Sequence, residues 1–283
     1  MKLVRYGEVG AEKPGILDPE GKIRDLSGVV KDITGDVLGP AGLKHLKSLD
    51  VSKLPRVTGN PRLGAPVGAV PKFLGIGLNY RDHAEETKAE IPRDPILFSK
   101  YATAIIGPDD PILLPAVSKE VDYEAELAFI MARRGRHIPK AQALEFVAGY
   151  TILHDVSARD YQIRKPGGQW MSGKTFDTFA PMGPALVTAE EIPDPHVLDI
   201  TCRVSGELLQ SSNTKHLIFS IPDIVAYCSH IFTLEPGDVI ATGTPGGVGF
   251  TRKPPRFLKE GDVAVLEIQG IGLLQNPVRL DSR

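Results

Sequence analysis

The sequence has few of the residues that mark disulfide-rich or nucleic-acid-binding proteins. Its two cysteines, Cys202 and Cys228, form neither a disulfide framework nor a Cys-x-x-Cys pair. The 33 basic and 35 acidic residues leave a net charge of -2, whereas nucleic-acid binders usually carry a basic surplus. No apolar run is long enough to span a bilayer, and the N-terminus does not resemble a signal peptide. We expect a cytoplasmic protein with no nucleic-acid or membrane partner.

A serine-hydrolase elbow is also absent, because no Gly-x-Ser-x-Gly sequence occurs. What the chain does contain is 42% hydrophobic residues over 283 positions, enough for a sizeable core. Its 24 prolines and 29 glycines are spread along the chain, which favours many short strands over a helical bundle. We therefore predict a strand-rich α+β fold with a small N-terminal domain (1–70) and a main domain (71–283).

The expected elements follow from local patterns. A turn signal at Asp18-Pro19-Glu20-Gly21 predicts a hairpin, and a Pro- and Gly-rich stretch (55–71) predicts the connection between the domains. Strands are expected at 73–77, 96–99, 121–131, 150–155, 199–205, 239–242 and 263–269. Helices are expected at 140–147 and after Ser220 as N-cap, with Pro222 early and an end near Phe232. Residues 79–86 suit a helix or a loop.

Three acidic residues alternate in the expected strand 121–131. Alternate side chains of a strand share a face, so Asp122, Glu124 and Glu126 would project together, opposite Tyr123 and its apolar neighbours. Like charges placed this close repel one another unless solvent or a cation neutralises them. The segment is therefore either a solvated edge face or part of a cation site.

A further carboxylate, Asp155, ends an apolar run at the point where functional loops begin. If the two strands are neighbours, Glu124, Glu126 and Asp155 form an all-oxygen site. Such a donor set favours Mg²⁺ or Mn²⁺, with Ca²⁺ possible, over Zn²⁺. The alternative for Asp155 is a plain cap or turn residue.

Four stretches together resemble the fumarylacetoacetate hydrolase family, from about Phe73 to the C-terminus. They are Asn79-Tyr80-Arg81-Asp82-His83, Asp122-Tyr123-Glu124-Ala125-Glu126-Leu127, Asp155-Val156-Ser157-Ala158-Arg159-Asp160-Tyr161-Gln162 and Thr242-Gly243-Thr244-Pro245. The resemblance implies a mixed β-roll fold and usually a homodimer. It also implies that Glu124, Glu126 and Asp155 hold the metal.

His83 and Glu86 are three residues apart and would share a face on a helical turn. A carboxylate beside an imidazole orients it and raises its basicity, which suits a general base that activates water. The alternative is a surface His–Glu pair, and Glu85 competes with Glu86 for the role. The resemblance implies that the pair lies on a lid over the substrate.

Lys174 is the third expected catalytic residue, as a cation that stabilises an oxyanion or a developing enolate. It lies in Gly168-Gln169-Trp170-Met171-Ser172-Gly173-Lys174-Thr175, which formally satisfies the phosphate-loop pattern G-x-x-x-x-G-K-[ST]. That motif requires a strand before it and a helix after it. The flanking sequence predicts neither, so nucleotide hydrolysis is disfavoured.

Four polar residues are candidates for substrate binding: Lys100, Arg159, Gln162 and Thr244. An arginine can hold a carboxylate through two parallel hydrogen bonds, although Arg159 could equally pair with Asp160 or a metal-ligand carboxylate. The loop around Thr244 could be merely a tight turn. We expect His154 to be a structural neighbour of Asp155, and Asp122 to support the site without binding the metal.

Together these features predict a metal-dependent hydrolase that cleaves a C–C bond of a small β-diketo or 2-oxo acid. Fumarylacetoacetate, acylpyruvates and 2,4-diketo-3-deoxy sugar acids are the substrate types considered. The same site could serve an oxaloacetate-type decarboxylase, an isomerase or a hydratase. The alternative from another class is a catalytically silent dimeric binding protein.

Overall fold

A large mixed sheet forms the centre of the molecule in the computed structural model, which describes residues 1–282. Two short strands, β4 (Leu63–Gly64) and β7 (Ile105–Ile106), add to it beside β1 and β13. Its main path runs in the order β3 (Ile23–Asp25), β2 (Lys13–Leu17), β1 (Lys2–Tyr6), β13 (Ala180–Thr188), β11 (Val147–His154), β10 (Ala125–Met131), β16 (Val239–Ala241), β5 (Phe73–Gly77) and β6 (Ile96–Ser99).

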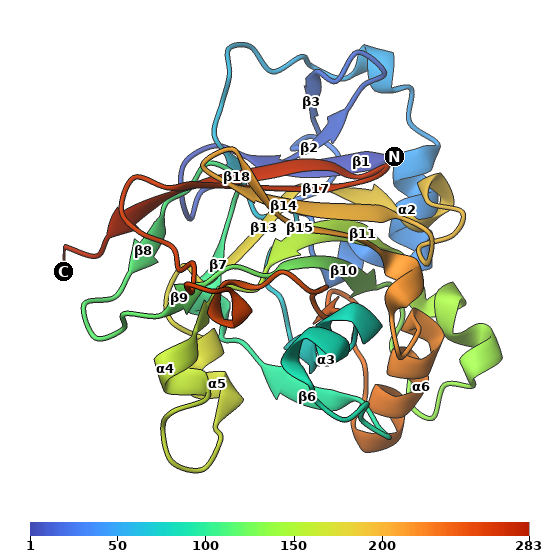
Figure 1. Ribbon diagram of the computed structural model, residues 1–283. Helices are drawn as coiled ribbons and strands as arrows, with labels where there is room; N and C mark the ends of the chain where they lie inside the picture. Colours follow the sequence, from blue (N-terminus) through green and yellow to red (C-terminus); the bar gives the residue numbers. More distant parts are fainter. Residues whose placement is uncertain (283) are drawn as a thin grey trace.

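A second, five-stranded sheet lies against the first (Figure 1). Its order is β15 (Glu207–Asn213), β14 (Asp199–Val204), β17 (Val263–Ile268), β18 (Gly272–Leu280) and β8 (Ile112–Leu114). The main core lies between the sheets, where Phe129 of β10 and Ile152 of β11 join Ile200 and Leu266 of the second sheet. A small ladder of β9 (Val121–Asp122) and β12 (Ser157–Ala158) lies beside the site described below.

The helices are short and cover the ends of the sheets (Figure 1). The α-helices are α1 (Gly35–Leu38), α2 (Pro40–Lys47), α3 (Arg81–Thr87), α4 (Arg159–Gln162), α5 (Trp170–Lys174) and α6 (Ile221–Ile231). The 3₁₀ turns are η1 (Val51–Lys53), η2 (Ala102–Ala104), η3 (Lys140–Phe146), η4 (Ala189–Glu191), η5 (Thr214–His216) and η6 (Gly249–Thr251).

Several local predictions are confirmed. The Asp18 turn joins β2 and β3, which pair antiparallel. Ser220 caps α6, Pro222 lies in the first turn, and Asp223 completes a capping box with Ser220. Segment 140–147 is helical but is a 3₁₀ helix rather than an α-helix.

Two expectations need correction. The strand expected at 121–131 is interrupted at Tyr123 and Glu124, so it forms β9 and β10 rather than one element. The long strand β13 was not predicted, because Pro181 and Pro184 within it are unfavourable in the interior of a sheet.

The N-terminal strands extend the large sheet, since β1 pairs antiparallel with β13. Leu3 and Ile16 share a buried cluster with Leu153 and Leu186 of the main sheet. The first 70 residues therefore share both a sheet and a core with the rest of the chain. The division into two domains stays a prediction.

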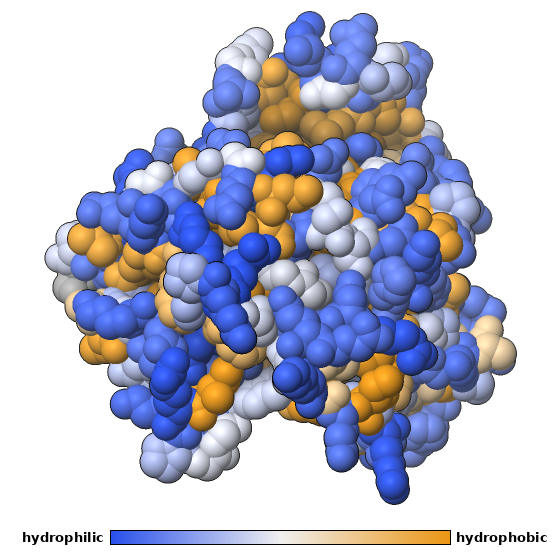
Figure 2. Space-filling model, viewed as in Figure 1, coloured by the Kyte–Doolittle hydropathy of each residue, from blue (hydrophilic) through white to orange (hydrophobic). Residues whose placement is uncertain are grey.

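The surface in Figure 2 is mostly polar, with apolar residues gathered in separate patches. Across residues 1–282, the structure contains no helix of the length and apolarity that crossing a membrane requires.

The capping box of α6 gives a test of the fold. Replacing Ser220 by Ala should lower the free energy of unfolding by about 1 kcal/mol, because an amide of the first turn loses its acceptor. Urea unfolding followed by circular dichroism measures this loss. Ser220→Asn, which keeps a capping oxygen, should retain most of the stability; equal losses in both variants would contradict the capping role.

Candidate active site

Strand pairing brings three buried carboxylates together. In the β10–β11 ladder, Ala125 lies opposite His154, and the amide of Asp155 donates to the carbonyl of Glu124 at 2.9 Å. Glu124 and Glu126 flank Ala125, whose side chain points into the core between the sheets. As a result Glu124, Glu126 and Asp155 each offer an oxygen within 4.8 Å of the others.

Three buried cations contact this carboxylate cluster. Lys174 Nζ donates to Glu124 Oε2 and Asp155 Oδ2, both at 2.6 Å. Arg159 lies 2.7 Å from Glu124 Oε1, and Lys100 donates to Asp155 Oδ1. Burial alone would raise the pKa of Glu124, but Lys174 and Arg159 lower it well below its usual range.

Glu126 is in a different position, because no ion pair reaches it within residues 1–282. Its one hydrogen bond comes from the amide of Gly243 at 2.7 Å. Burial, followed by the negative charges of Asp155 and Glu124, raises the pKa of Glu126 well above its usual value. The neighbouring cations therefore do not neutralise all of the negative charge of this cluster.

A divalent cation fits this arrangement. Four buried carboxylates face three buried cations, namely Asp122, Glu124, Glu126 and Asp155 against Lys100, Arg159 and Lys174. The three carboxylates that converge provide only oxygen ligands, which hard cations such as Mg²⁺ and Mn²⁺ prefer. Such an ion would relieve the repulsion at Glu126.

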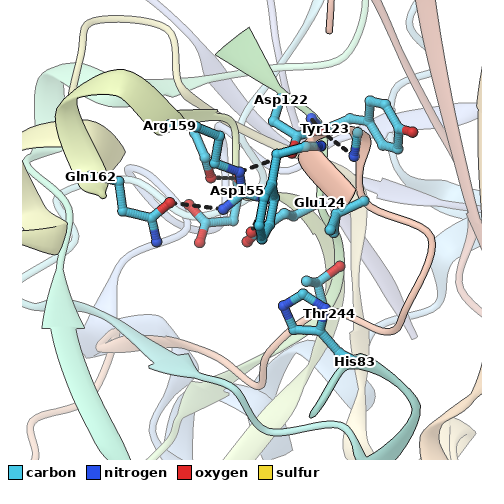
Figure 3. A network of polar contacts seen from close by, with 12 residues as sticks. His83, Asp122, Tyr123, Glu124, Asp155, Arg159, Gln162 and Thr244 are labelled. Atoms are coloured by element: carbon cyan, nitrogen blue, oxygen red, sulfur yellow. Dashed lines mark hydrogen bonds and ion pairs between the residues drawn. The ribbon is translucent and has the colours of Figure 1, made fainter. Parts of the chain in front are cut away.

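His83 lines the cavity beside this cluster and, with Glu86, comes from helix α3; Figure 3 shows the imidazole directed toward the open space beside Thr244. His83 Nδ1 lies 3.5 Å from Glu86 Oε2. Glu86 is fixed by the amide of Gly247 at 3.0 Å and the hydroxyl of Thr251 at 2.8 Å. Burial alone would raise the pKa of Glu86, but the neighbouring His83 and hydrogen bonds from Thr251 and Gly247 lower it. An ionised Glu86 is therefore placed to orient the imidazole. Among the described residues, the carboxylate beside the His83 ring is that of Glu86 and not that of its competitor Glu85.

A cavity of about 190 Å³ joins these groups. It is smaller than the roughly 300–1,000 Å³ typical of pockets for drug-sized ligands, so it suits a small acid. Of the ten predicted site residues, seven line it: His83, Glu124, Glu126, Arg159, Gln162, Lys174 and Thr244. Asp155, Lys100 and Glu86 support the lining residues through the contacts described above.

The polar residues predicted to bind substrate hold one another in place. Arg159 donates to Asp122 at 2.8 Å and to Gln162 Oε1 at 2.7 Å, which leaves the amide nitrogen of Gln162 toward the cavity (Figure 3). The Thr244 hydroxyl donates to the carbonyl of Ala125 at 3.0 Å. Lys100 lies behind Asp155, away from the cavity lining.

Asp122 and His154 lie beside the carboxylate cluster, where supporting residues were expected. Asp122 accepts bonds from the amides of Gly249 and Phe250 and from Arg159. His154 is buried, and burial lowers its pKa to about 3, so the ring is neutral.

The phosphate-loop pattern around Lys174 forms no phosphate loop. Helix α5 lies inside the pattern and ends at Lys174 itself, and the next regular element is strand β13. The ammonium of Lys174 points at carboxylates instead of a phosphate site.

The sequence reasoning missed the aromatic part of the cavity wall, formed by Phe98, Trp170 and Phe250. The alternating glycines Gly75 and Gly77 of β5 were an available signal, because glycine within a strand often marks the close approach of another group.

Comparison with known proteins places this site in a family. Residues 72–279 match the family described as fumarylacetoacetate (FAA) hydrolase C-terminal. The chain belongs to the fumarylacetoacetate hydrolase family. A Burkholderia multivorans relative, named only as a hydrolase, is 50% identical over 273 residues, which is 96% of each chain.

Solved structures share the fold across the whole chain, which confirms the predicted strand-rich architecture. Fumarylacetoacetate hydrolase from Exiguobacterium antarcticum is 38% identical, with a TM-score of 0.88 over 99% of this chain and 100% of that one. A 5-carboxymethyl-2-hydroxymuconate delta-isomerase from Mycobacterium smegmatis is 36% identical, with a TM-score of 0.76 and full coverage of both chains. Maleylpyruvate hydrolase from Sphingobium sp. SYK-6, solved with manganese(II) and pyruvate, is 29% identical, with a TM-score of 0.83 and full coverage of both chains.

Replacing Glu126 by Gln tests the metal site. The amide removes one ligand charge, so Mn²⁺ affinity should fall at least about 100-fold, as even changes around a ligand cost tenfold or more. The metal-free protein should be no less stable than wild type, because the substitution relieves repulsion. Isothermal titration and thermal melting with and without Mn²⁺ measure both effects. Glu207→Gln, on the exposed edge strand β15, is the control; undiminished affinity in Glu126→Gln would refute the ligand assignment.

Proposed function

We propose that this protein is a divalent-metal-dependent hydrolase that cleaves a C–C bond in a small β-diketo or 2-oxo acid. The observation that carries the proposal is the convergence of two chemical units on one small cavity. One is the carboxylate cluster of Glu124, Glu126 and Asp155. The other is the His83–Glu86 pair of helix α3, whose imidazole lines the same cavity.

The carboxylate cluster would hold the metal, either Mg²⁺ or Mn²⁺. When bound, the metal supplies Lewis-acid polarisation of the substrate's oxygens. The manganese and pyruvate in the Sphingobium enzyme support this choice of ion and of ligand chemistry. The amide of Gln162 and the ammonium of Lys174 line the same cavity, where they would stabilise negative charge as it develops on the substrate.

His83 would act as the general base. Its ring takes a proton from a water molecule, and the ionised Glu86 behind Nδ1 stabilises the resulting imidazolium. The water oxygen attacks the distal carbonyl carbon, and the C–C bond next to it breaks. The electron pair of that bond stays on the departing carbon, delocalised onto the adjacent carbonyl, until a proton returns to the carbon. One product is a carboxylic acid and the other a 2-oxo acid.

An isomerase is the second candidate, supported by the Mycobacterium smegmatis isomerase among the structural relatives. Isomerisation needs only proton transfers, for which the same base would serve. The His83–Glu86 pair favours hydrolysis because it can deprotonate water. The homodimer implied by the resemblance stays a prediction.

Assays with a small panel of substrates distinguish the possible reaction types. Acetylpyruvate, oxaloacetate and a 2,4-diketo-3-deoxy sugar acid are incubated with Mg²⁺ or Mn²⁺, each with an EDTA control, and the products are analysed. We expect EDTA-sensitive cleavage of a diketo acid into two fragments. Release of CO₂ from oxaloacetate alone would indicate a decarboxylase. Bound metal with no turnover of any compound would contradict the hydrolase and favour an isomerase, a hydratase or a binding protein.

Substitution of the base separates catalysis from metal binding. His83→Gln should lower kcat by about 10²- to 10⁴-fold, the usual contribution of a general base. The stabilisation by Mn²⁺ should remain, because His83 is outside the carboxylate cluster. Steady-state kinetics and thermal melting provide the two readouts, with His45→Gln on the exposed face of α2 as the control. A kcat within twofold of wild type would exclude His83 as the base.

A further inference from the structure

The lining of the active-site cavity combines a charged part and an apolar wall. The charged part contains Glu124 and Glu126 with Arg159 and Lys174. The apolar wall is formed by Ile76 of β5, Leu78 after it, Phe98 of β6, Ile163 after α4 and Trp170 of α5.

Alternating glycines make room for the aromatic part of this wall. A Cβ atom on Gly77 would lie 1.9 Å from Trp170 Cζ3, and one on Gly75 would lie 2.2 Å from Phe98 Cζ. Both rings therefore lie directly on the backbone of β5, because side chains two apart on a strand share a face. The two ring centroids are 6.0 Å apart, close enough to form one continuous apolar surface.

Helix α5 connects this apolar wall to the charged part. Trp170 and Lys174 are four residues apart, so they lie on the same face of the helix. Lys174 Nζ lies 5.1 Å from the centre of the Phe98 ring. A substrate group that contacts the Phe98 ring would therefore lie beside the ammonium of Lys174.

In the described part of the chain, the cavity lining contains no cation without a carboxylate partner. The cationic residues that line the cavity are Arg159 and Lys174, and both are paired with carboxylates. His83 could pair with an anion only in its protonated form, which cannot act as the base. A second carboxylate on the substrate would lose its hydration without gaining a partner, which is costly.

We propose that this enzyme selects 2,4-dioxo acids with a single carboxylate and a short apolar tail, and that Trp170 and Phe98 contact the tail. This inference rests on the proposed C–C hydrolase function and narrows its substrate class. It disfavours substrates that carry a second carboxylate at the far end, and also polyhydroxylated sugar acids, whose hydroxyl groups would be left unpaired against the same wall.

Three substrates of graded tail chemistry test the proposal on the wild-type enzyme with Mn²⁺. Acetylpyruvate has a methyl tail, butanoylpyruvate adds two methylene groups, and fumarylpyruvate has a tail of similar length that ends in a carboxylate. We expect kcat/KM for butanoylpyruvate to exceed that for acetylpyruvate by about tenfold, from the burial of two methylenes. Fumarylpyruvate should be slower than butanoylpyruvate by about 100-fold or more.

Variants of Trp170 test whether this side chain determines the selectivity for the substrate tail. In Trp170→Ala, the ratio of kcat/KM for butanoylpyruvate over acetylpyruvate should fall to about twofold or less, because the tail loses its contact surface. Trp170→Arg should raise fumarylpyruvate turnover relative to butanoylpyruvate at least about tenfold, since a guanidinium can pair with the terminal carboxylate. Met171→Ala is the matched control, because Met171 is the next residue of α5 and is absent from the cavity lining.

The outcomes separate this inference from the function on which it rests. Cleavage of fumarylpyruvate as fast as butanoylpyruvate would overturn the tail selectivity while leaving the hydrolase function intact. A ratio unchanged in Trp170→Ala would overturn the role of Trp170. Cleavage of none of the three would reject the hydrolase function itself, and the inference with it. The wild-type comparison needs no variant, so it decides the substrate class even where a Trp170 variant fails to fold.

Discussion

Repulsion among buried carboxylates is the constraint on which the site depends. Glu124, Glu126 and Asp155 meet in buried positions, where like charges interact more strongly than in water. Lys174 and Arg159 neutralise Glu124, but Glu126 receives only an amide hydrogen bond. A divalent cation would complete the neutralisation, and in the function we propose it would polarise the oxo acid. In this account, the repulsion among the carboxylates explains both why the site would bind a cation and why it would polarise a substrate.

The scaffold meets this constraint by joining segments far apart in sequence at one end of the large sheet. Strands β10 and β11 fix the carboxylates through their register, and the loop after β16 supplies Gly243 to Glu126 and Gly247 to Glu86. One loop therefore holds both a carboxylate of the proposed metal site and the carboxylate beside the proposed base. The second sheet packs against the other face of β10. This packing fixes the orientation of the strand, so its acidic residues stay on the side of the cluster.

Local patterns in the sequence revealed the parts of the site that depend on local geometry. The alternation of Glu124 and Glu126 and the position of Asp155 at a strand end were enough to predict a carboxylate cluster, which the structure contains. The aromatic wall was not predictable in the same way. The contact of Trp170 with Gly77 joins residues more than ninety positions apart. The glycines of β5 indicate the close approach of some group, but no local pattern identifies that group as Trp170. The proline-containing strand β13 was missed because tertiary pairing overrides a local preference.

Anomalous diffraction from crystals grown with MnCl₂ tests the central claim most directly, because it locates the ion without reference to activity. The account predicts a single strong manganese peak within bonding distance of carboxylate oxygens of Glu124, Glu126 and Asp155, in the charged part of the cavity. It also predicts that the peak disappears in Glu126→Gln crystals. A manganese ion bound elsewhere, or no peak at this cluster at saturating Mn²⁺, would contradict the account.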